Sequence, residues 1–321
     1  MATPDVQSAQ LARSGGADWL SLALIDARNH TLAWLAVFEG STALTQALQL
    51  AAPGQAGDDR VRSQLVATME ALLDQLASVG DDDDEALRPY RAALHREDRL
   101  VESFAYLAQA QGIPPATALL APPLVLAPRE PLWFAAQAVA APPARGWRPD
   151  NEAGDHDESL PEFEIDAQAV TWQQFVEFMA DGGYDDTQWW SDPGWAWVQA
   201  EQRRAPRDVE QWRPGVRVQS FGRPVRVSLA APVVGVSRHE AEAWCRWARR
   251  RLPAGVEWQL AAGQGASRGF VAHQVSEWVL GRSMQRGVPW FAPRRLAHPA
   301  LRSAVAADRD DGFYGFRSCA P

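Results

Sequence analysis

Histidine and acidic side chains are the groups of this chain that could hold a metal ion, and both occur in the segment RAALHREDRLVESF at 91–104. Imidazoles four residues apart on a helix project from one face and can chelate one ion. No two of the six histidines have that spacing, so each is expected at the surface or in support of another group. The histidines are His30, His95, His156, His239, His273 and His298. A site built from His30, His95 and either Glu97 or Glu102 is the alternative.

The two cysteines and the acidic run at 81–85 predict structural roles. Cys245 and Cys319 are too few for a disulfide framework or a thiolate zinc site, and two small buried core residues are expected. The run 81–85 holds five consecutive carboxylates without the alternating spacing and glycine of a calcium loop. It is expected to begin a helix, because acidic side chains favour a helix N-terminus.

Composition indicates an ordinary globular protein. A length of 321 residues favours two domains, and 46% hydrophobic with 22% charged residues can form cores of normal size. The net charge of −9 argues against nucleic acid and anionic membranes as partners. The first residues lack the pattern of a secretory signal and no 18-residue apolar run occurs, so the expected location is the cytoplasm.

Hydrophobic spacing predicts three long helices in the first third of the chain. Apolar residues recur every three or four positions over residues 19–39 and 61–77. A third helix is expected over 86–111, ending at the Gly112-Ile113-Pro114-Pro115 sequence. These helices predict a helical domain at 1–113.

The rest of the chain predicts a connector and a second domain. Prolines throughout 114–149 indicate an extended connector on a domain surface, with one short strand. Residues 150–321 are rich in Trp and Gly and predict a loop-rich α+β domain. Helices are expected within it at 171–181 and 237–250, the second beginning with a capping box of Ser237 and Glu240.

Four blocks of the second domain together resemble a known family. They are the run beginning FEIDAQAVTWQQF at 163–197, EAEAWCRWARRRLPAGVEWQLAA at 240–262, VSEWVLG at 275–281 and RDDGFYGFRSCA at 309–320. Their order and spacing resemble the formylglycine-generating-enzyme (sulfatase-modifying factor) family, which also contains PvdO-type proteins. The resemblance implies a variant of the C-type lectin fold over 150–321.

Two further segments make the resemblance narrower. GWRPDNEAGDHDESLPEF at 146–163 and RRLAHPALRSAVAADRDDGFYGFRSCA at 294–320 resemble EgtB, the ergothioneine-biosynthesis sulfoxide synthases, and still more selenoneine synthases. Those enzymes join a DinB-like four-helix bundle to the lectin-like domain. They use non-heme iron and oxygen to attach sulfur or selenium to the imidazole of hercynine.

The resemblance also implies that this chain lacks the iron ligands. Relatives hold iron with three histidines, two of them on the helix that matches 91–104, where Arg96 and Leu100 stand in their places. His95 is one position out of register, about 100° around the helix. The third ligand follows the first helix, but 39–60 is short and contains no histidine. A shortened, degenerate bundle of about three helices and no metal is therefore expected.

The resemblance suggests further site residues. Asp308, Asp310 and Asp311 match a loop that helps hold an amino-acid-like substrate, where carboxylates would pair with an ammonium group or with Arg91. A solvated turn before the following glycine is the equal alternative. Gln274 replaces the usual Asn of a calcium-binding loop, which argues against calcium.

The cysteine positions of relatives bear on two other expectations. Cys245 and Cys319 match positions that can form a structural disulfide in relatives, but in the cytoplasm buried thiols are expected. The copper-binding cysteine pair of formylglycine-generating enzymes has no counterpart in RLAHPALRSAVAADRDD at 295–311.

Two functions of different class remain open. The first is a non-catalytic relative, a pseudoenzyme that binds a small betaine or thiol ligand or serves as a partner subunit, without cofactor. A shortened bundle should leave an apolar stripe uncovered, which predicts a homodimer or a complex with an intact paralogue. The second is an active iron(II) enzyme that forms a carbon–sulfur or carbon–selenium bond on hercynine with substitute ligands, although such iron needs about three well-placed ligands.

Overall fold

The computed structural model describes residues 5–54, 57–120, 122–123, 125–139, 146–152, 158–281 and 284–321, so His156 lies outside the described residues. The chain forms two compact units. A helical unit holds Met1–Ala121, Pro142–Ala153 and Phe291–His298. A mixed unit holds Pro122–Ala141, Gly154–Trp290 and Pro299–Pro321. The predicted α+β class is confirmed.

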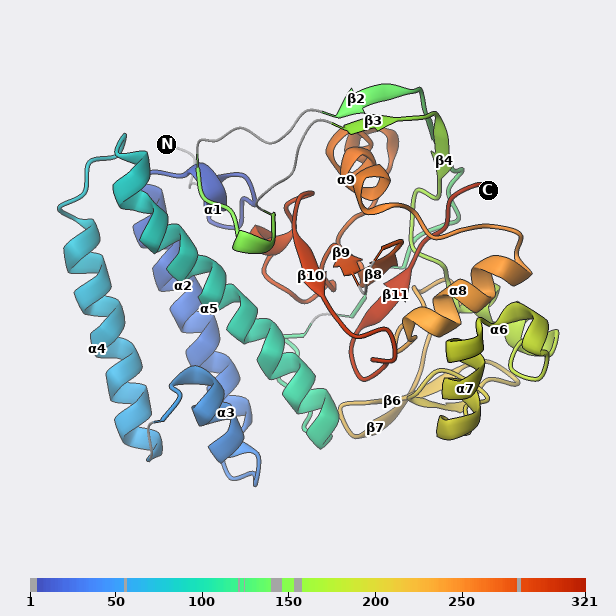
Figure 1. The fold of residues 1–321 in the computed structure, drawn as a ribbon. Coiled ribbons are helices and arrows are strands. Elements are labelled where there is room, and N and C mark those ends of the chain that lie inside the picture. The colour runs from blue at the N-terminus through green and yellow to red at the C-terminus, as the bar shows by residue number, and fades with distance from the viewer. Residues whose placement is uncertain are drawn as a thin grey trace. The chain divides into compact units, whose positions relative to one another are not determined.

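The helical unit is built on three long helices, α2 (Ala17–Val37), α4 (Asp58–Leu76) and α5 (Asp84–Gln111) (Figure 1). Two shorter helices, α1 (Leu11–Ser14) and α3 (Leu44–Ala51), accompany them. The later segments of the unit contribute the short 3-10 helices η1 (Asp150–Glu152) and η4 (Arg294–Leu296). α3 contacts all three long helices, so it completes the packing at one end of the bundle.

Periodic burial explains why α5 is so long. Leu87, Leu94, Val101 and Ala108 recur every seven residues and are fully buried, so one stripe of the helix faces the core. The Asp83 carboxylate accepts a hydrogen bond from the Ala86 backbone N–H at 3.0 Å and caps the helix start. Gly112 ends the helix in the left-handed conformation that glycine favours.

The three long helices expected from the sequence are present, and the short helix α3 adds to them. α3 forms in the short segment that follows the first long helix. The reason is that LTQALQLA is short but amphipathic, with Ala47 and Leu48 buried. What this element lacks is a histidine, since none occurs between residues 39 and 60.

The helical unit extends beyond the boundary expected at residue 113, because charged contacts tie distant segments into it. Arg13 donates two hydrogen bonds to the Glu152 carboxylate, at 2.6 and 2.8 Å. Arg295 donates to Asp98, with Nη2 to Oδ1 at 2.8 Å, and both side chains are almost completely buried. Segments from the expected connector and from the expected second domain therefore belong to the helical unit.

The mixed unit contains one larger sheet in the strand order β10-β9-β8-β11, formed by β8 (Ser276–Val279), β9 (Met284–Arg286), β10 (Arg302–Ala304) and β11 (Tyr314–Phe316). β8 and β11 are parallel, while β8–β9 and β9–β10 are antiparallel. Four helices belong to the same unit. They are α6 (Trp172–Ala180), α7 (Asp192–Glu201), α8 (Arg238–Trp247) and α9 (Gly255–Gln264).

Small sheets complete the mixed unit and correct the expectation for the connector. β1 (Leu132–Phe134) pairs with β4 (Phe163–Ile165), and β2 (Gln137–Val139) pairs with β3 (Glu158–Leu160). The three remaining strands, β5 (Val209–Gln211), β6 (Arg217–Ser220) and β7 (Arg223–Arg226), form a sheet of their own. The expected connector therefore contributes two strands where one was expected.

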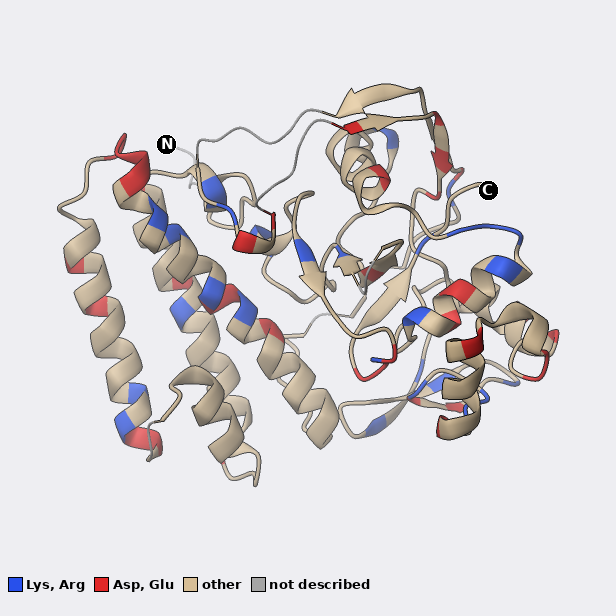
Figure 2. Cartoon of the chain, in the orientation of Figure 1, with Lys and Arg blue, Asp and Glu red and all other residues tan. Residues whose placement is uncertain are grey.

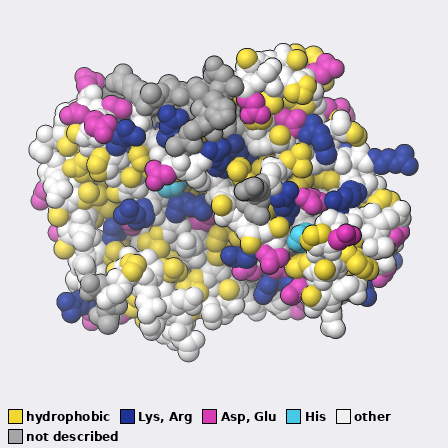
Figure 3. All heavy atoms as spheres, in the orientation of Figure 1, with side chains coloured by type: hydrophobic (Ala, Val, Ile, Leu, Met, Phe, Trp, Pro, Cys, Tyr) yellow, Lys and Arg dark blue, Asp and Glu magenta, His cyan; other side chains and the backbone are white. Residues whose placement is uncertain are grey.

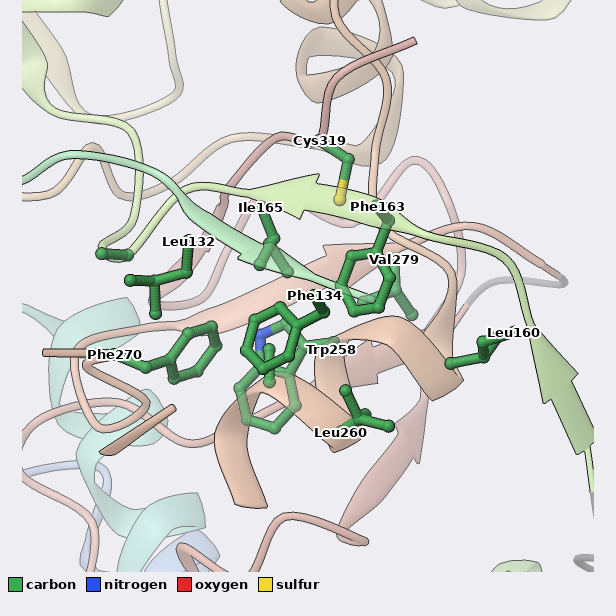
Figure 4. Packing of buried hydrophobic residues seen from close by; sticks show 12 residues of the cluster. Leu132, Phe134, Leu160, Phe163, Ile165, Trp258, Leu260, Phe270, Val279 and Cys319 are labelled. Atoms are coloured by element: carbon green, nitrogen blue, oxygen red, sulfur yellow. The ribbon is translucent and has the colours of Figure 1, made fainter. Parts of the chain in front are cut away.

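The core of the mixed unit shows why the connector is ordered there. The rings of Phe134 and Phe163 stack with centroids 5.1 Å apart, beside Trp258 and Phe270 (Figure 4). Leu132 and Phe134 are 8% and 3% exposed, so β1 is part of the core rather than a surface segment. Burying such aromatic rings contributes strongly to folding.

Local signals in the second unit were predicted correctly. The expected capping box of Ser237 and Glu240 begins α8, and the structure adds a second one, of Thr171 and Gln174, at the start of α6. Cys245 and Cys319 are free thiols and buried, and burial raises the pKa of each thiol well above its usual value. Both thiols are therefore unreactive core groups. Among the described residues, no helix combines the length and apolarity needed to cross a bilayer.

Candidate functional site

The helical unit contains a pocket of about 610 Å³ between its helices. All of its lining residues come from α2, from α3 and the two residues after it, from α4 and from α5. Arg96 and Leu100, one helical turn apart on α5, both line this pocket. The positions where the resemblance places iron ligands therefore face one shared cavity.

Arg28 anchors the pocket wall by joining three helices. Its Nη2 donates to Glu97 Oε2 at 3.1 Å, and Nε lies 3.0 Å from the other oxygen of that carboxylate. Its Nη1 donates to the Leu65 carbonyl on α4 at 3.0 Å. Burial lowers the pKa of the Arg28 guanidinium, while the charge of Glu97 acts in the opposite direction. Glu97 thus neutralises Arg28.

The remaining charge of the pocket is positive. Arg99 Nη1 donates to Glu102 Oε2 at 2.6 Å, and that carboxylate also accepts from the Tyr106 hydroxyl at 3.0 Å. Arg96 is exposed and has no ion pair within the part of the chain that the structure describes. Figure 2 shows acidic and basic positions interleaved along α5. The lining holds three guanidinium groups against one carboxylate.

Both carboxylates of the alternative metal site built on His30 and His95 are already in ion pairs. Glu97 is paired with Arg28, and Glu102 with Arg99. His95 packs against Trp147 at 5.0 Å between ring centroids, and burial together with Arg99 and Arg13 lowers its pKa to about 4. Within the described ranges, no group of three His, Cys, Asp or Glu side chains could hold a metal ion.

Arg91 is a structural residue of the helical unit. Its side chain is 2% exposed, and its Nε and Nη2 donate to the Gly15 carbonyl at 3.2 and 3.0 Å. Its Nη1 donates to Asp84 Oδ1 at 2.7 Å. The partners of Arg91 are therefore Gly15 and Asp84 rather than the carboxylates expected from the sequence.

The acidic loop of the mixed unit is held by arginines of its own unit. Asp310 is 4% exposed, and its carboxylate accepts hydrogen bonds from Arg203 and from Arg207, the latter at 3.0 Å. Asp311 pairs with Arg309. Asp308 lies in the same loop but joins neither pair. Asp310 thus stabilises the loop, and its two oxygens are already engaged.

A buried acid lies close to this loop in the mixed unit. The Tyr184 hydroxyl donates to Glu240 Oε1 at 2.5 Å, and Glu240 Oε2 accepts from the Ser237 backbone N–H at 2.6 Å. Burial raises the pKa of Glu240 to about 7, while these hydrogen bonds lower it. Because Glu240 is fully buried, this cluster stabilises the start of α8.

Gln274 replaces the usual asparagine of the calcium loop and is also engaged. It is 3% exposed, and its side-chain oxygen accepts from the Ala169 backbone N–H at 3.3 Å. The side-chain oxygen that could bind calcium is therefore already hydrogen-bonded to the backbone.

Sequence reasoning missed three arginines that shape the helical unit. Arg28 and Arg295 have partners 69 and 197 residues away, so no local pattern identifies them. Arg99 is different, since its spacing of three from Glu102 is a recognisable helix ion pair.

Comparison with known proteins identifies a family for part of the chain. Residues 134–286 match the sulfatase-modifying factor enzyme 1-like domain. This part of the chain is a domain of that family. A hercynine oxygenase of Mycobacterium tuberculosis is 40% identical over 113 residues, which cover 35% of this chain and 26% of the relative. Another from Mycolicibacterium smegmatis is 36% identical over 150 residues, 46% of this chain and 33% of the relative.

Other relatives of the family differ in the function that their names state. An inactive C-alpha-formylglycine-generating enzyme 2 of Mus musculus is 31% identical over 177 residues, 52% of this chain and 53% of that protein. The chain thus spans about a quarter to a half of the length of these curated relatives. The structure of PvdO from Pseudomonas aeruginosa has 17% identity and a TM-score of 0.37, covering 59% of this chain and 93% of that one. A likeness at this level supports no conclusion on function.

The pocket residues do not fit an iron(II) ion. A guanidinium is always protonated and offers no electron pair, and a leucine side chain offers none either. Arg96 also places a positive charge where the resemblance places a ligand, and like charges repel. The donor set of this pocket is therefore suited to an anion rather than to a cation.

Proposed function

We propose that this chain is a non-catalytic member of the sulfatase-modifying factor family, resembling ergothioneine and selenoneine synthases but acting as a ligand-binding or partner subunit. The observation that carries the proposal is that Arg96 and Leu100 line one pocket, in which Glu97 is neutralised by Arg28. No cofactor is proposed, neither iron nor calcium. The active iron enzyme that acts on hercynine is the alternative, and metal loading distinguishes the two.

The test loads the full chain with iron(II) without oxygen, removes unbound metal and measures bound iron. The proposal expects far less than one iron per chain and no oxygen consumption with a thiol and hercynine. A double variant, Arg96→His with Leu100→His, serves as the positive control. It should bind cobalt(II) about tenfold or more tightly than the wild type, because imidazoles four apart share one face.

Two results would contradict the proposal. Stoichiometric iron in the wild-type chain with oxygen consumption would favour the active enzyme. Equal cobalt affinity of the wild type and the double variant would mean that positions 96 and 100 do not face a common site.

The partner prediction belongs to the same proposal. Leu22 and Ile25 on α2 are 46% and 43% exposed and lie one turn apart, which leaves apolar surface on the shortened bundle. A second copy of the chain or an intact paralogue would cover it. Light scattering should show a dimer that Leu22→Glu with Ile25→Glu weakens, whereas Leu229→Glu on the mixed unit should not. A monomer, alone and with the paralogue, would count against it.

Location and excluded partners complete the proposal. Cytoplasm is proposed, without nucleic-acid or membrane partners, and cell fractionation tests the location. The net charge of −9 supports the exclusion. Figure 3 supports it too, since basic and acidic side chains are interspersed on the face in view. A betaine or thiol ligand in the acidic loop at Asp308, Asp310 and Asp311 has less support, because Asp310 is paired.

A further inference from the structure

We infer that the pocket of the helical unit binds a small organic monoanion, a carboxylate with a short apolar body, with Arg96 as its anchor. The inference deepens the proposed function, on which it rests, by naming the class of ligand. It depends on three observations: the charges that remain after pairing, the apolar wall and the size of the cavity.

The charge that remains in the pocket matches a single negative charge. Arg28 and Glu97 cancel each other across 3.0 Å. Arg99 is partly neutralised by Glu102, which lies outside the lining. Arg96 is left with no ion pair among the described residues. One unpaired guanidinium suits a carboxylate, which it can bind through two parallel hydrogen bonds, better than a phosphate dianion.

The other polar groups of the lining favour this arrangement. The Thr68 hydroxyl donates to the backbone carbonyls of Gln64 and Leu65, and the Ser103 hydroxyl donates to the Arg99 carbonyl. Their protons are already used within the helices. The charged donors that remain in the lining are therefore the guanidinium of Arg96 and the remaining N–H groups of Arg99, and the side-chain amide of Gln64 is a neutral donor beside them.

Much of the rest of the wall is apolar. Its aliphatic members come from the end of α3 and the two residues after it, from α4 and from α5, and they are Leu50, Ala51, Ala52, Pro53, Leu65, Ala93 and Leu100. A volume of about 610 Å³ falls within the range of small-molecule sites. A charged end on Arg96 with a short hydrocarbon body against Leu100 uses both parts of the pocket.

Calorimetry with hexanoate tests the inference on the full chain in buffer freed of metal by a resin, because soluble chelators are themselves carboxylates. We expect saturable binding at one site. Arg96→Gln should weaken it about tenfold, the effect of losing one charge-assisted contact. Arg88→Gln is the matched control, since Arg88 lies on the same helix, is paired with Glu85 and is outside the lining. It should bind as the wild type does.

Two comparison probes test the two parts of the ligand. Hexan-1-ol keeps the apolar body without the charge and should bind about tenfold more weakly than hexanoate. Inorganic phosphate keeps charge without the body and should also bind more weakly. Phosphate binding equal to that of hexanoate would overturn the inference, because it would indicate diffuse attraction to surface charge.

Further results decide the matter. Absence of saturable hexanoate binding, or equal loss in Arg96→Gln and Arg88→Gln, would overturn the inference. Circular dichroism checks that Arg96→Gln is folded, and Arg99→Gln, expected to weaken binding as well, is the second variant. Iron loading is a separate measurement, so stoichiometric iron would overturn the proposed function whatever hexanoate does.

Discussion

The two units bury an ionisable group in opposite ways. In the mixed unit, Glu277 and Arg317 are both 0% exposed and form an ion pair, with Arg317 Nη2 donating to Glu277 Oε1 at 2.6 Å. In the helical unit, burial and the nearby charges of Arg99 and Arg13 lower the pKa of His95 to about 4, so it is neutral at pH 7. A group removed from water must be paired or uncharged.

Within the part of the chain that the structure describes, Arg96 is neither paired nor uncharged, and this difference points to a role in binding. It carries a charge without an ion pair among the described residues, and it is exposed in an open cavity. Water meets the needs of its guanidinium in the free protein. A group kept in this state costs little stability and is available to a ligand, whereas Glu277 and Arg317 are committed to the fold.

The largest expected effect comes from breaking the buried ion pair of Glu277 and Arg317. Glu277→Ala would leave Arg317 charged and buried, although its Nη1 still donates to the Asp166 carbonyl at 2.9 Å. The Trp258 indole N–H, which donates to Glu277 Oε2 at 2.9 Å, would also lose its acceptor. We expect a loss of about 3–5 kcal/mol in the free energy of unfolding of the mixed unit. Urea denaturation followed by tryptophan fluorescence measures it.

A half-exposed ion pair of the same unit provides the control. Glu164 pairs with Arg250 at 2.9 Å, but its side chain is 40% exposed. Glu164→Ala should cost less than about 1 kcal/mol, because solvent screens the pair. Similar losses of unfolding free energy for Glu277→Ala and Glu164→Ala would contradict this prediction, because they would mean that burial of an ion pair does not decide its contribution to stability.

Local features of the fold could be predicted from sequence. The long helices follow from apolar residues at three- and four-residue steps. The starts of α6 and α8 follow from Thr171 with Gln174 and from Ser237 with Glu240, because a capping box is complete within four residues. The family could be predicted as well, since its blocks are long and ordered.

Long-range partners could not be predicted in this way. Arg295 and Asp98 are separated by 197 residues, and Arg317 and Glu277 by 40. Only the folded chain brings these charges together. The same limit explains the error over Arg91, whose carbonyl partner Gly15 lies 76 residues away, and the error over the connector, whose Phe134 is placed by Phe163.

The smaller expected effect concerns His95 and the pH dependence of stability. Its pKa is about 4 in the folded state against 6.5 for the free side chain. Between these values the unfolded chain binds a proton that the folded chain does not, so stability falls as pH falls from about 6.5 to about 4. His95→Phe keeps a ring against Trp147 and removes this proton, so the fall should be shallower by at most about 1.4 kcal/mol per pH unit. His298, whose pKa burial lowers to about 3, keeps its own share in the variant. Parallel pH profiles for the wild type and His95→Phe would mean that His95 takes up its proton without unfolding, and the rule of pairing or neutrality would then fail at this position.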